Sequence, residues 1–294
     1  MNCSLLMLVD RLEAPALART RARLRESAGR GQHAQIFMAA EAHPELAVEF
    51  RGVSFRLDHG ATLLRDLDLS VRRGELMVLL GRSGSGKTTT LKLINRLLEP
   101  TSGQVLVDGR SASEWSPIQL RRSIGYAIQE VGLFPHFTVE RNIGLVPSLE
   151  GWTRERIHQR ARELLGLVGL EPQIAARYPR ELSGGQRQRV GVARALAADP
   201  PILLMDEPFG ALDALTRAEL QREFLGLHQR LRKTTVFVTH DLREALLLGS
   251  RIALLEAGRL VATYTPNEFL HAQEPLAAAY VRAFQAGNQP QGRS

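Results

Sequence analysis

The sequence predicts an α/β fold built on a mainly parallel sheet, and two observations lead to this prediction. Three largely apolar runs have the length and composition of strands that are buried on both faces of a parallel sheet: residues 76–80, 202–205 and 235–238. Helical patterns separate these runs, and one of them, over residues 91–98, stops before Pro100. Buried strands that alternate with helices are typical of α/β domains.

Two further regions extend this core. Residues 46–50 and 53–57 alternate apolar and polar side chains, as paired antiparallel strands do, and they predict an antiparallel β subdomain. Residues 152–197 have an almost entirely helical pattern. We therefore expect a helical subdomain of about residues 130–197, inserted into the α/β core.

The two ends of the chain differ from this core. Residues 1–44 begin with an Arg- and Ala-rich stretch whose apolar run, residues 5–9, is too short for a secretory signal. We expect a disordered or loosely helical leader there, with Met38 as the biological start. A single domain then spans residues 45–285, and a flexible tail follows over residues 286–294.

The composition is that of an ordinary globular protein, with 44% hydrophobic and 23% charged residues among 294. No apolar run approaches the roughly 18 to 20 residues that cross a bilayer. The formal net charge is +7, of which residues 1–37 carry six Arg against three acids, or +3. A nucleic-acid partner is one interpretation of this excess. Without a basic stripe interleaved with aromatics, we favour a scattered excess in a protein that handles anionic nucleotides, and expect no nucleic-acid partner. The single cysteine, Cys3, excludes an internal disulfide, which suits a reducing cytoplasm.

A phosphate-binding loop is the strongest single motif. It follows the buried strand 76–80, precedes a helical pattern and fits G-x-x-x-x-G-K-[ST] over eight positions, with one further threonine: Gly81, Arg82, Ser83, Gly84, Ser85, Gly86, Lys87, Thr88 and Thr89. Glycines let backbone N–H groups curl around phosphates at a helix N-terminus. Lys87 would contact the β- and γ-phosphates, and the Thr88 hydroxyl would ligate Mg²⁺. A glycine-rich turn that merely links strand to helix is the alternative, and the match in this context disfavours it.

Two acids end the buried run 202–205. Burying acids at a strand end is costly unless a cation or hydrogen bonds compensate. A Mg²⁺-nucleotide would compensate, with Asp206 holding the metal ion and Glu207 polarising the attacking water as a general base. Exposed acids often end strands, so the pair indicates a Mg²⁺-nucleotide site only together with the phosphate loop upstream.

A third motif consists of Leu182 and the four residues after it, Ser183, Gly184, Gly185 and Gln186. Ser183 and Gln186 alone could form a capping box. Two consecutive glycines are not needed for such a box, and they leave bare N–H groups at a helix N-terminus, which is an anion site. The motif resembles L-S-G-G-Q, the defining signature of the ABC ATPase family. The resemblance extends over roughly residues 46–285.

The resemblance implies a head-to-tail homodimer, or a pseudo-symmetric pair, that encloses two ATP molecules. Ser183 to Gln186 of one subunit would cover the γ-phosphate held by the other subunit's loop. Gln129 would be a further ligand of Mg²⁺ and would sense the γ-phosphate, Asp213 would span the dimer interface, and His240 would orient the water beside Glu207. Phe55 matches the aromatic that stacks on adenine, although an aromatic in a strand is often core.

Among ABC proteins, residues 124–136, 142–147 and 151–152 resemble the ATPases of osmoprotectant importers, which take up glycine betaine, choline or carnitine. The resemblance implies separate membrane permease subunits, a substrate-binding protein and a place on the cytoplasmic face of a bacterial membrane. Another small solute, or a soluble ABC ATPase acting on nucleic acid, remains the alternative. Many such ATPases continue into paired CBS domains, and we expect no gating by these in a chain that ends at Ser294.

Overall fold

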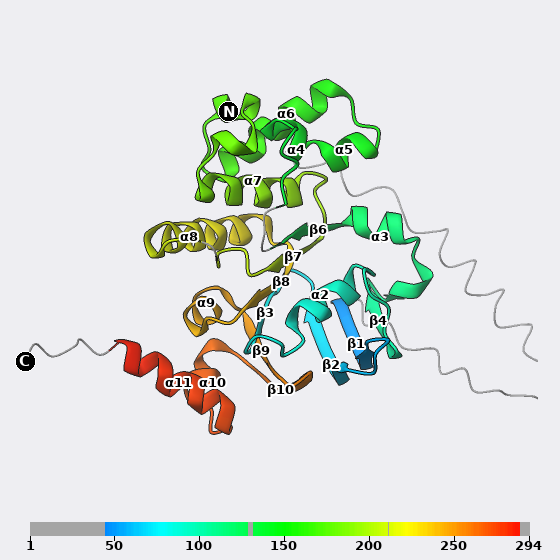
Figure 1. Cartoon of the computed structure of the whole chain (residues 1–294), viewed down its shortest axis with the longest axis vertical. Coiled ribbons are helices and arrows are strands. Elements are labelled where there is room, and N and C mark those ends of the chain that lie inside the picture. Colours follow the sequence, from blue (N-terminus) through cyan, green and yellow to red (C-terminus); the bar gives the residue numbers. More distant parts are fainter. Residues whose placement is uncertain (1–44, 129–131, 211, 289–294) are drawn as a thin grey trace, which may run out of the picture. The chain divides into compact units, whose positions relative to one another are not determined.

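Two sheets organise the computed structural model, which describes residues 45–128, 132–210 and 212–288 (Figure 1). The larger sheet has the strand order β10-β9-β3-β8-β7-β6, in which only the β10–β9 pair is antiparallel within the described residues. Its strands are β3 (Leu76–Leu80), β6 (Ile124–Ala127), β7 (Ile202–Asp206), β8 (Thr234–Thr239), β9 (Arg251–Glu256) and β10 (Arg259–Tyr264). The predicted α/β fold with a mainly parallel sheet is confirmed.

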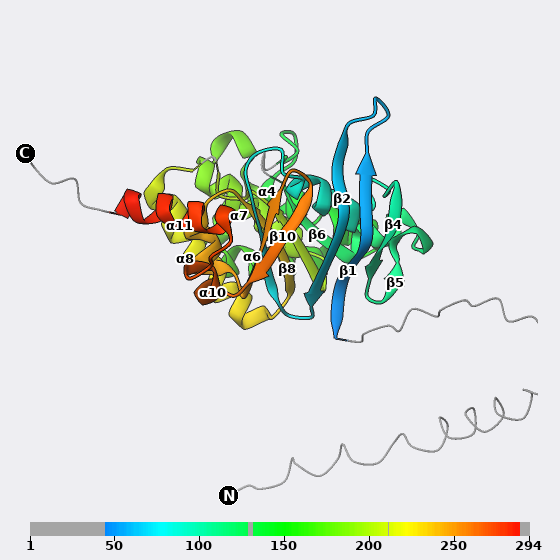
Figure 2. The same ribbon diagram turned by 90° about the horizontal axis from the view of Figure 1, so that it is seen from below.

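The smaller sheet is antiparallel, with the order β2-β1-β4-β5. Its strands are β1 (Leu46–Arg56), β2 (Thr62–Arg72), β4 (Ser102–Val107) and β5 (Arg110–Ser111). The two alternating runs near residues 46–57, expected to behave as paired strands, lie in one strand, β1, which pairs with β2 and β4 (Figure 2). A bulge at Gly52 joins the runs, because its backbone takes a φ of +56° and its N–H leaves the ladder to donate 2.8 Å to Oδ1 of Asp68.

The helices cover both faces of the larger sheet and fill the connection between β6 and β7. They are α2 (Lys87–Ile94), α3 (Pro117–Ser123), α4 (Val139–Ile143), α5 (Leu145–Leu149), α6 (Arg154–Leu167), α7 (Gly184–Leu196), α8 (Ala214–Leu231), α9 (Leu242–Leu248), α10 (Pro266–Leu270) and α11 (Pro275–Asn288), with 3₁₀ turns η1 (Ala112–Glu114), η2 (Pro172–Ala176) and η3 (Pro179–Glu181). Figure 1 shows α4, α5, α6 and α7 grouped at one end of the domain and α10 and α11 at the other. Among the described residues, none of these helices combines the length and the apolarity that crossing a bilayer requires.

Two helix ends differ from the expectation. α2 ends at Ile94, four residues before Leu98, because the Asn95 side chain accepts a hydrogen bond of 3.2 Å from Leu97 N–H and Arg96 adopts a φ of +53°. At the other end of the chain, α11 continues to Asn288, past the expected domain end at residue 285. The leader, residues 1–44, and the last residues of the tail lie outside the described residues.

The core has two parts, one on each face of the larger sheet. Every residue of β3 is fully buried; Leu76, Val78 and Leu80 pack on the side of α7, α8 and α9, whereas Met77 and Leu79 face α2 and the antiparallel sheet. This burial on both faces explains the continuous apolar run. The carboxyl ends of β3, β7 and β8 lead into the three segments that carry the predicted site residues, at the edge where α/β sheets bind ligands.

Candidate functional site

The phosphate loop connects β3 to α2, and two of its glycines are sterically required. A Cβ at Gly81 would lie 2.4 Å from the carbonyl oxygen of Leu255, and one at Gly86 would lie 2.5 Å from Cδ2 of Leu64. Gly86 also has a φ of +101° and is the N-cap of α2, with no side-chain cap. The first turn of α2 therefore presents bare backbone N–H groups to the loop, which is the arrangement that binds phosphate.

Lys87 lies inside this loop. Its side chain is buried, and Nζ donates hydrogen bonds of 2.8 Å to the carbonyl of Gly81 and 2.9 Å to that of Arg82. Burial lowers the pKa of the Lys87 ammonium, and the negative charges of Glu207 and Asp206 oppose that shift. The Oγ of Ser85 is also buried, and it has no hydrogen-bond partner among the described residues. An ammonium and a spare hydroxyl beside bare N–H groups fit the oxygens of a nucleotide phosphate.

Asp206 ends β7 and meets two hydroxyl groups. The Thr88 hydroxyl donates 3.0 Å to Oδ1, and the Tyr126 hydroxyl donates to Oδ2 at 3.4 Å. Burial raises the pKa of the Asp206 carboxyl, since these hydroxyl groups only partly replace water. A hydroxyl and a carboxylate are the oxygen ligands that Mg²⁺ prefers, so Thr88 and Asp206 fit this metal ion. Gln129, the third expected ligand, lies outside the described residues.

Glu207 and His240 come together from two neighbouring strand ends. Nδ1 of His240 lies 3.2 Å from Oε2 of Glu207, and the Glu207 N–H donates 3.1 Å to the carbonyl of Val238. Glu207 has a φ of +45°, so the chain turns away from β7 at this residue. The His240 side chain is 62% exposed and that of Glu207 20% exposed, so both can be reached by a ligand.

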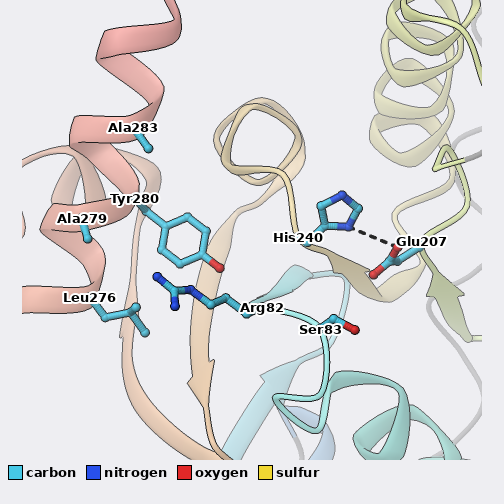
Figure 3. Close-up of a pocket in the computed structure, with 8 residues that line it drawn as sticks. All are labelled: Arg82, Ser83, Glu207, His240, Leu276, Ala279, Tyr280 and Ala283. Atoms are coloured by element: carbon cyan, nitrogen blue, oxygen red, sulfur yellow. Dashed lines mark hydrogen bonds and ion pairs between the residues drawn. The ribbon is translucent and has the colours of Figure 1, made fainter.

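A cavity of about 590 Å³ lies in front of this pair (Figure 3). The phosphate loop, Glu207 and His240 form one side of it, and α11 forms the other. The residues that line it are Arg82, Ser83, Glu207, His240, Leu276, Ala279, Tyr280 and Ala283. Figure 3 shows the Arg82 side chain extending toward Tyr280 and α11, away from Glu207.

The wall formed by α11 was not predicted, nor was the contact of Tyr126 with Asp206. A signal for the wall exists in the spacing 276, 279, 280 and 283, which places four side chains on one face of a helix. No such signal exists for Tyr126, because its contact depends on β6 pairing with β7.

The signature residues form a different surface. Ser183 is the N-cap of α7, and its hydroxyl accepts a hydrogen bond of 3.2 Å from Gln186 N–H, while Oε1 of Gln186 accepts one of 2.9 Å from Ser183 N–H. The capping box is thus formed, and both Ser183 and Gly184 are exposed. Asp213, the exposed N-cap of α8, accepts 3.0 Å from Thr216 N–H. Neither Asp213 nor the signature is among the residues that line the cavity of their own chain.

Phe55 does not present its ring to a ligand. It is 8% exposed and packs with Val53 and Leu64 in the core of the antiparallel sheet. The prediction that Phe55 stacks on adenine therefore lacks the exposed aromatic face that it requires. Residues 53 and 55 share one face of β1, and that face is the buried one.

Comparison with known proteins identifies the family of the chain. The family model described as "ABC transporter" matches residues 64–210. The glycine betaine/carnitine/choline transport ATP-binding protein OpuCA of Bacillus subtilis is 55% identical over 211 residues, which are 72% of this chain and 56% of that protein. The glycine betaine uptake system ATP-binding protein YehX of Escherichia coli is 51% identical over 223 residues, which are 76% of this chain and 72% of that protein.

This chain belongs to the ABC transporter family. Among solved structures, the dimeric MJ0796, a bacterial ABC transporter cassette, superposes with a TM-score of 0.68 and 34% identity, covering 74% of this chain and 98% of that one. A post-hydrolysis state of MJ0796 holds ADP and Pi. The chain spans about half the length of relatives such as OpuCA.

Proposed function

We propose that this chain binds Mg²⁺-ATP and hydrolyses it, and that hydrolysis powers an importer of quaternary-amine osmoprotectants such as glycine betaine, choline or carnitine. The observation that carries the proposal is the Glu207–His240 pair, held 3.2 Å apart at the cavity that the phosphate loop also lines. The names of OpuCA and YehX support the class of cargo.

In this proposal the phosphate loop binds the triphosphate. The N–H groups at the start of α2 and the Ser85 hydroxyl donate to its oxygens, and Nζ of Lys87 exchanges its bonds to Gly81 and Arg82 for bonds to the β- and γ-phosphates. Because Lys87 is buried, its charge acts on the phosphates with little screening by water.

Thr88 and Asp206 would hold the metal ion, with Gln129 as a further ligand. Bound Mg²⁺ would supply Lewis-acid stabilisation of the charge that develops on the phosphate oxygens. The same two side chains are joined by a hydrogen bond of 3.0 Å, so their oxygens are already gathered at one place.

Hydrolysis then depends on Glu207 and His240. The Glu207 carboxylate accepts a proton from the attacking water, the water oxygen bonds to the γ-phosphorus, and the bond from that phosphorus to the bridging oxygen breaks, which leaves ADP and phosphate. His240 orients the water and Glu207, and Lys87 neutralises charge on the leaving group.

A second copy completes the site. The signature of this chain lies outside its own cavity and keeps Ser183 and Gly184 exposed, so a partner's phosphate loop can be covered by Ser183, Gly184, Gly185 and Gln186, with Asp213 at the interface. The dimeric MJ0796 supports this arrangement. The pair would act beneath separate permease subunits on the cytoplasmic face of a bacterial membrane, with cargo delivered by a binding protein.

The test is ATPase activity of the full chain with its candidate permease in lipid, with and without betaine-loaded binding protein. We expect stimulation by the loaded binding protein in the wild type and its loss in Glu207→Gln. Activity that depends on Glu207 but ignores betaine would contradict only the cargo. Activity that Glu207→Gln retains would contradict the catalytic assignment.

A further inference from the structure

A buried carboxylate joins three elements around His240. Glu244 on α9 is 5% exposed. Its Oε1 accepts a hydrogen bond of 2.9 Å from Nε2 of Gln221 on α8, and its Oε2 accepts one of 2.5 Å from the hydroxyl of Thr239 at the end of β8. Gln221 and Thr239 are buried as well. Water therefore cannot readily replace either hydrogen bond.

The Thr239 hydroxyl also forms a hydrogen bond to the backbone on the far side of His240. Its Oγ1 accepts a hydrogen bond of 3.0 Å from the N–H of Asp241, while its proton goes to Glu244. Thr239 and Asp241 are the two neighbours of His240 in the chain. One hydroxyl therefore ties together both sides of the segment that carries the imidazole, and Glu244 orients that hydroxyl.

The helix α8 links the same carboxylate to the proposed dimer interface. α8 starts at its N-cap Asp213, and one turn later Nη2 of Arg217 donates 2.9 Å to the carbonyl of Leu212. One further turn along the helix, Gln221 holds Glu244. Burial raises the pKa of Glu244, and the charge of Arg217 is among the influences that oppose this shift.

A purely structural explanation fits this geometry poorly. An acid in the first turn of α9 could serve that helix N-terminus alone. The hydrogen bonds of Glu244, however, go to side chains from α8 and β8, not to the N–H groups of α9. Burying a carboxylate costs stability, and an apolar side chain of the same size would avoid that cost. The carboxylate instead fixes two other elements relative to α9.

We propose that Glu244 is a positioning residue. Through Thr239 and Gln221 it holds the His240 segment against α8, and so sets the imidazole in its place beside Glu207. This inference rests on the proposed function, because it concerns the geometry of the residues that hydrolyse ATP.

Variants of Thr239 test the inference with a control on the same strand. Thr239→Val removes the hydroxyl and keeps the shape, while Thr239→Ser keeps the hydroxyl. Thr235→Val is the matched control, because Thr235 is equally buried in β8 and its hydroxyl contacts the Lys233 carbonyl and Nδ1 of His228, and neither contact involves His240 or Glu244. For each full-length variant, kcat and KM for ATP and the thermal midpoint are measured.

We expect Thr239→Val and Glu244→Gln to lower kcat about tenfold or more, since small misplacements of catalytic groups have effects of this size. KM for ATP should stay within about twofold, because the phosphate loop is untouched. Thr239→Ser and Thr235→Val should keep the wild-type kcat, even where the thermal midpoint of Thr235→Val falls as far as that of Thr239→Val.

A double-mutant cycle separates positioning from general loss of structure. In a His240→Ala background, Thr239→Val should lower single-turnover hydrolysis by less than about twofold, because its effect acts through the missing imidazole. An unchanged kcat in Thr239→Val, or an equal loss with and without His240, would overturn the inference while the proposed function stands. A wild type without Glu207-dependent hydrolysis would overturn both.

Discussion

The hydroxyl of Thr88 donates a hydrogen bond of 3.0 Å to Oδ1 of Asp206, so the first turn of α2 and the end of β7 meet at one point. The two residues are 118 positions apart in the sequence. Their contact aligns the phosphate loop with the acidic strand end and places the two proposed ligands of Mg²⁺ together.

Removal of the Thr88 hydroxyl should impair the use of Mg²⁺. Thr88→Val keeps the shape of the side chain but offers no oxygen to the metal ion, so we expect ATPase activity at low Mg²⁺ to fall about tenfold or more. A Mg²⁺ titration of the steady-state rate measures the effect. Thr88→Ser, which keeps the hydroxyl, is the control, and equal Mg²⁺ dependence in the Val and Ser variants would refute the assignment.

Asp206→Asn should stabilise the nucleotide-free protein while it abolishes turnover. Burial raises the pKa of the Asp206 carboxyl above its ordinary value of 3.8. A group with a raised pKa contributes its stability below pH 3.8 and loses it as pH rises through the folded-state pKa. The thermal midpoint of the wild type without nucleotide should therefore fall relative to that of Asp206→Asn as pH rises from about 4 toward 7.

The activity of the same variant provides the second half of this prediction. Without the carboxylate the site loses its strongest metal ligand, and we expect ATPase activity to drop about 100-fold or more. A midpoint difference that does not change with pH would show that burial of the Asp206 charge does not weaken the native state.

Lys87→Ala should lose nucleotide affinity. A charge-assisted hydrogen bond contributes about 1.5–3 kcal/mol, so we expect the Kd for ATP to rise about tenfold or more. Fluorescence titration with a labelled ATP analogue measures it. Lys233→Ala is the control, since Lys233 pairs with Asp199 at 2.9 Å and does not line the cavity. An unchanged Kd in Lys87→Ala would exclude the phosphate contact.

Two glycines should respond to alanine in opposite directions. A Cβ at Gly125 in β6 would lie 2.2 Å from the carbonyl oxygen of Ala195 on α7, so Gly125→Ala should lower the free energy of unfolding by about 1–3 kcal/mol. Gly226 lies in α8 with no atom within 4 Å of such a Cβ, and Gly226→Ala should raise it by about 0.5–1 kcal/mol. Urea unfolding of both variants checks the pair, and destabilisation of similar size in both would contradict the packing of β6 on α7.

Much of the candidate site could be predicted from sequence because its chemistry is local. The phosphate loop, the acidic strand end and the signature are each continuous segments, and their neighbours in the chain largely define their conformation. Glycines at 81 and 86, a buried strand before them and a helix after them leave few arrangements open. The fold class followed in the same way from buried runs that alternate with helices.

Only the tertiary structure decided which side chains these segments meet. Phe55 fits the strand pattern whichever face of β1 it occupies, and the packing of β1 against the core buried its ring. The bulge at Gly52 merged two expected strands into one, because a single glycine with positive φ can continue a strand that the alternating pattern interrupts. The contacts of Tyr126 with Asp206, of α11 with the cavity and of Glu244 with Thr239 join residues whose separation in space depends on the whole sheet. Sequence pattern determines local conformation, whereas contacts between distant segments, and which face of an element is buried, are set by the packing of every element between them.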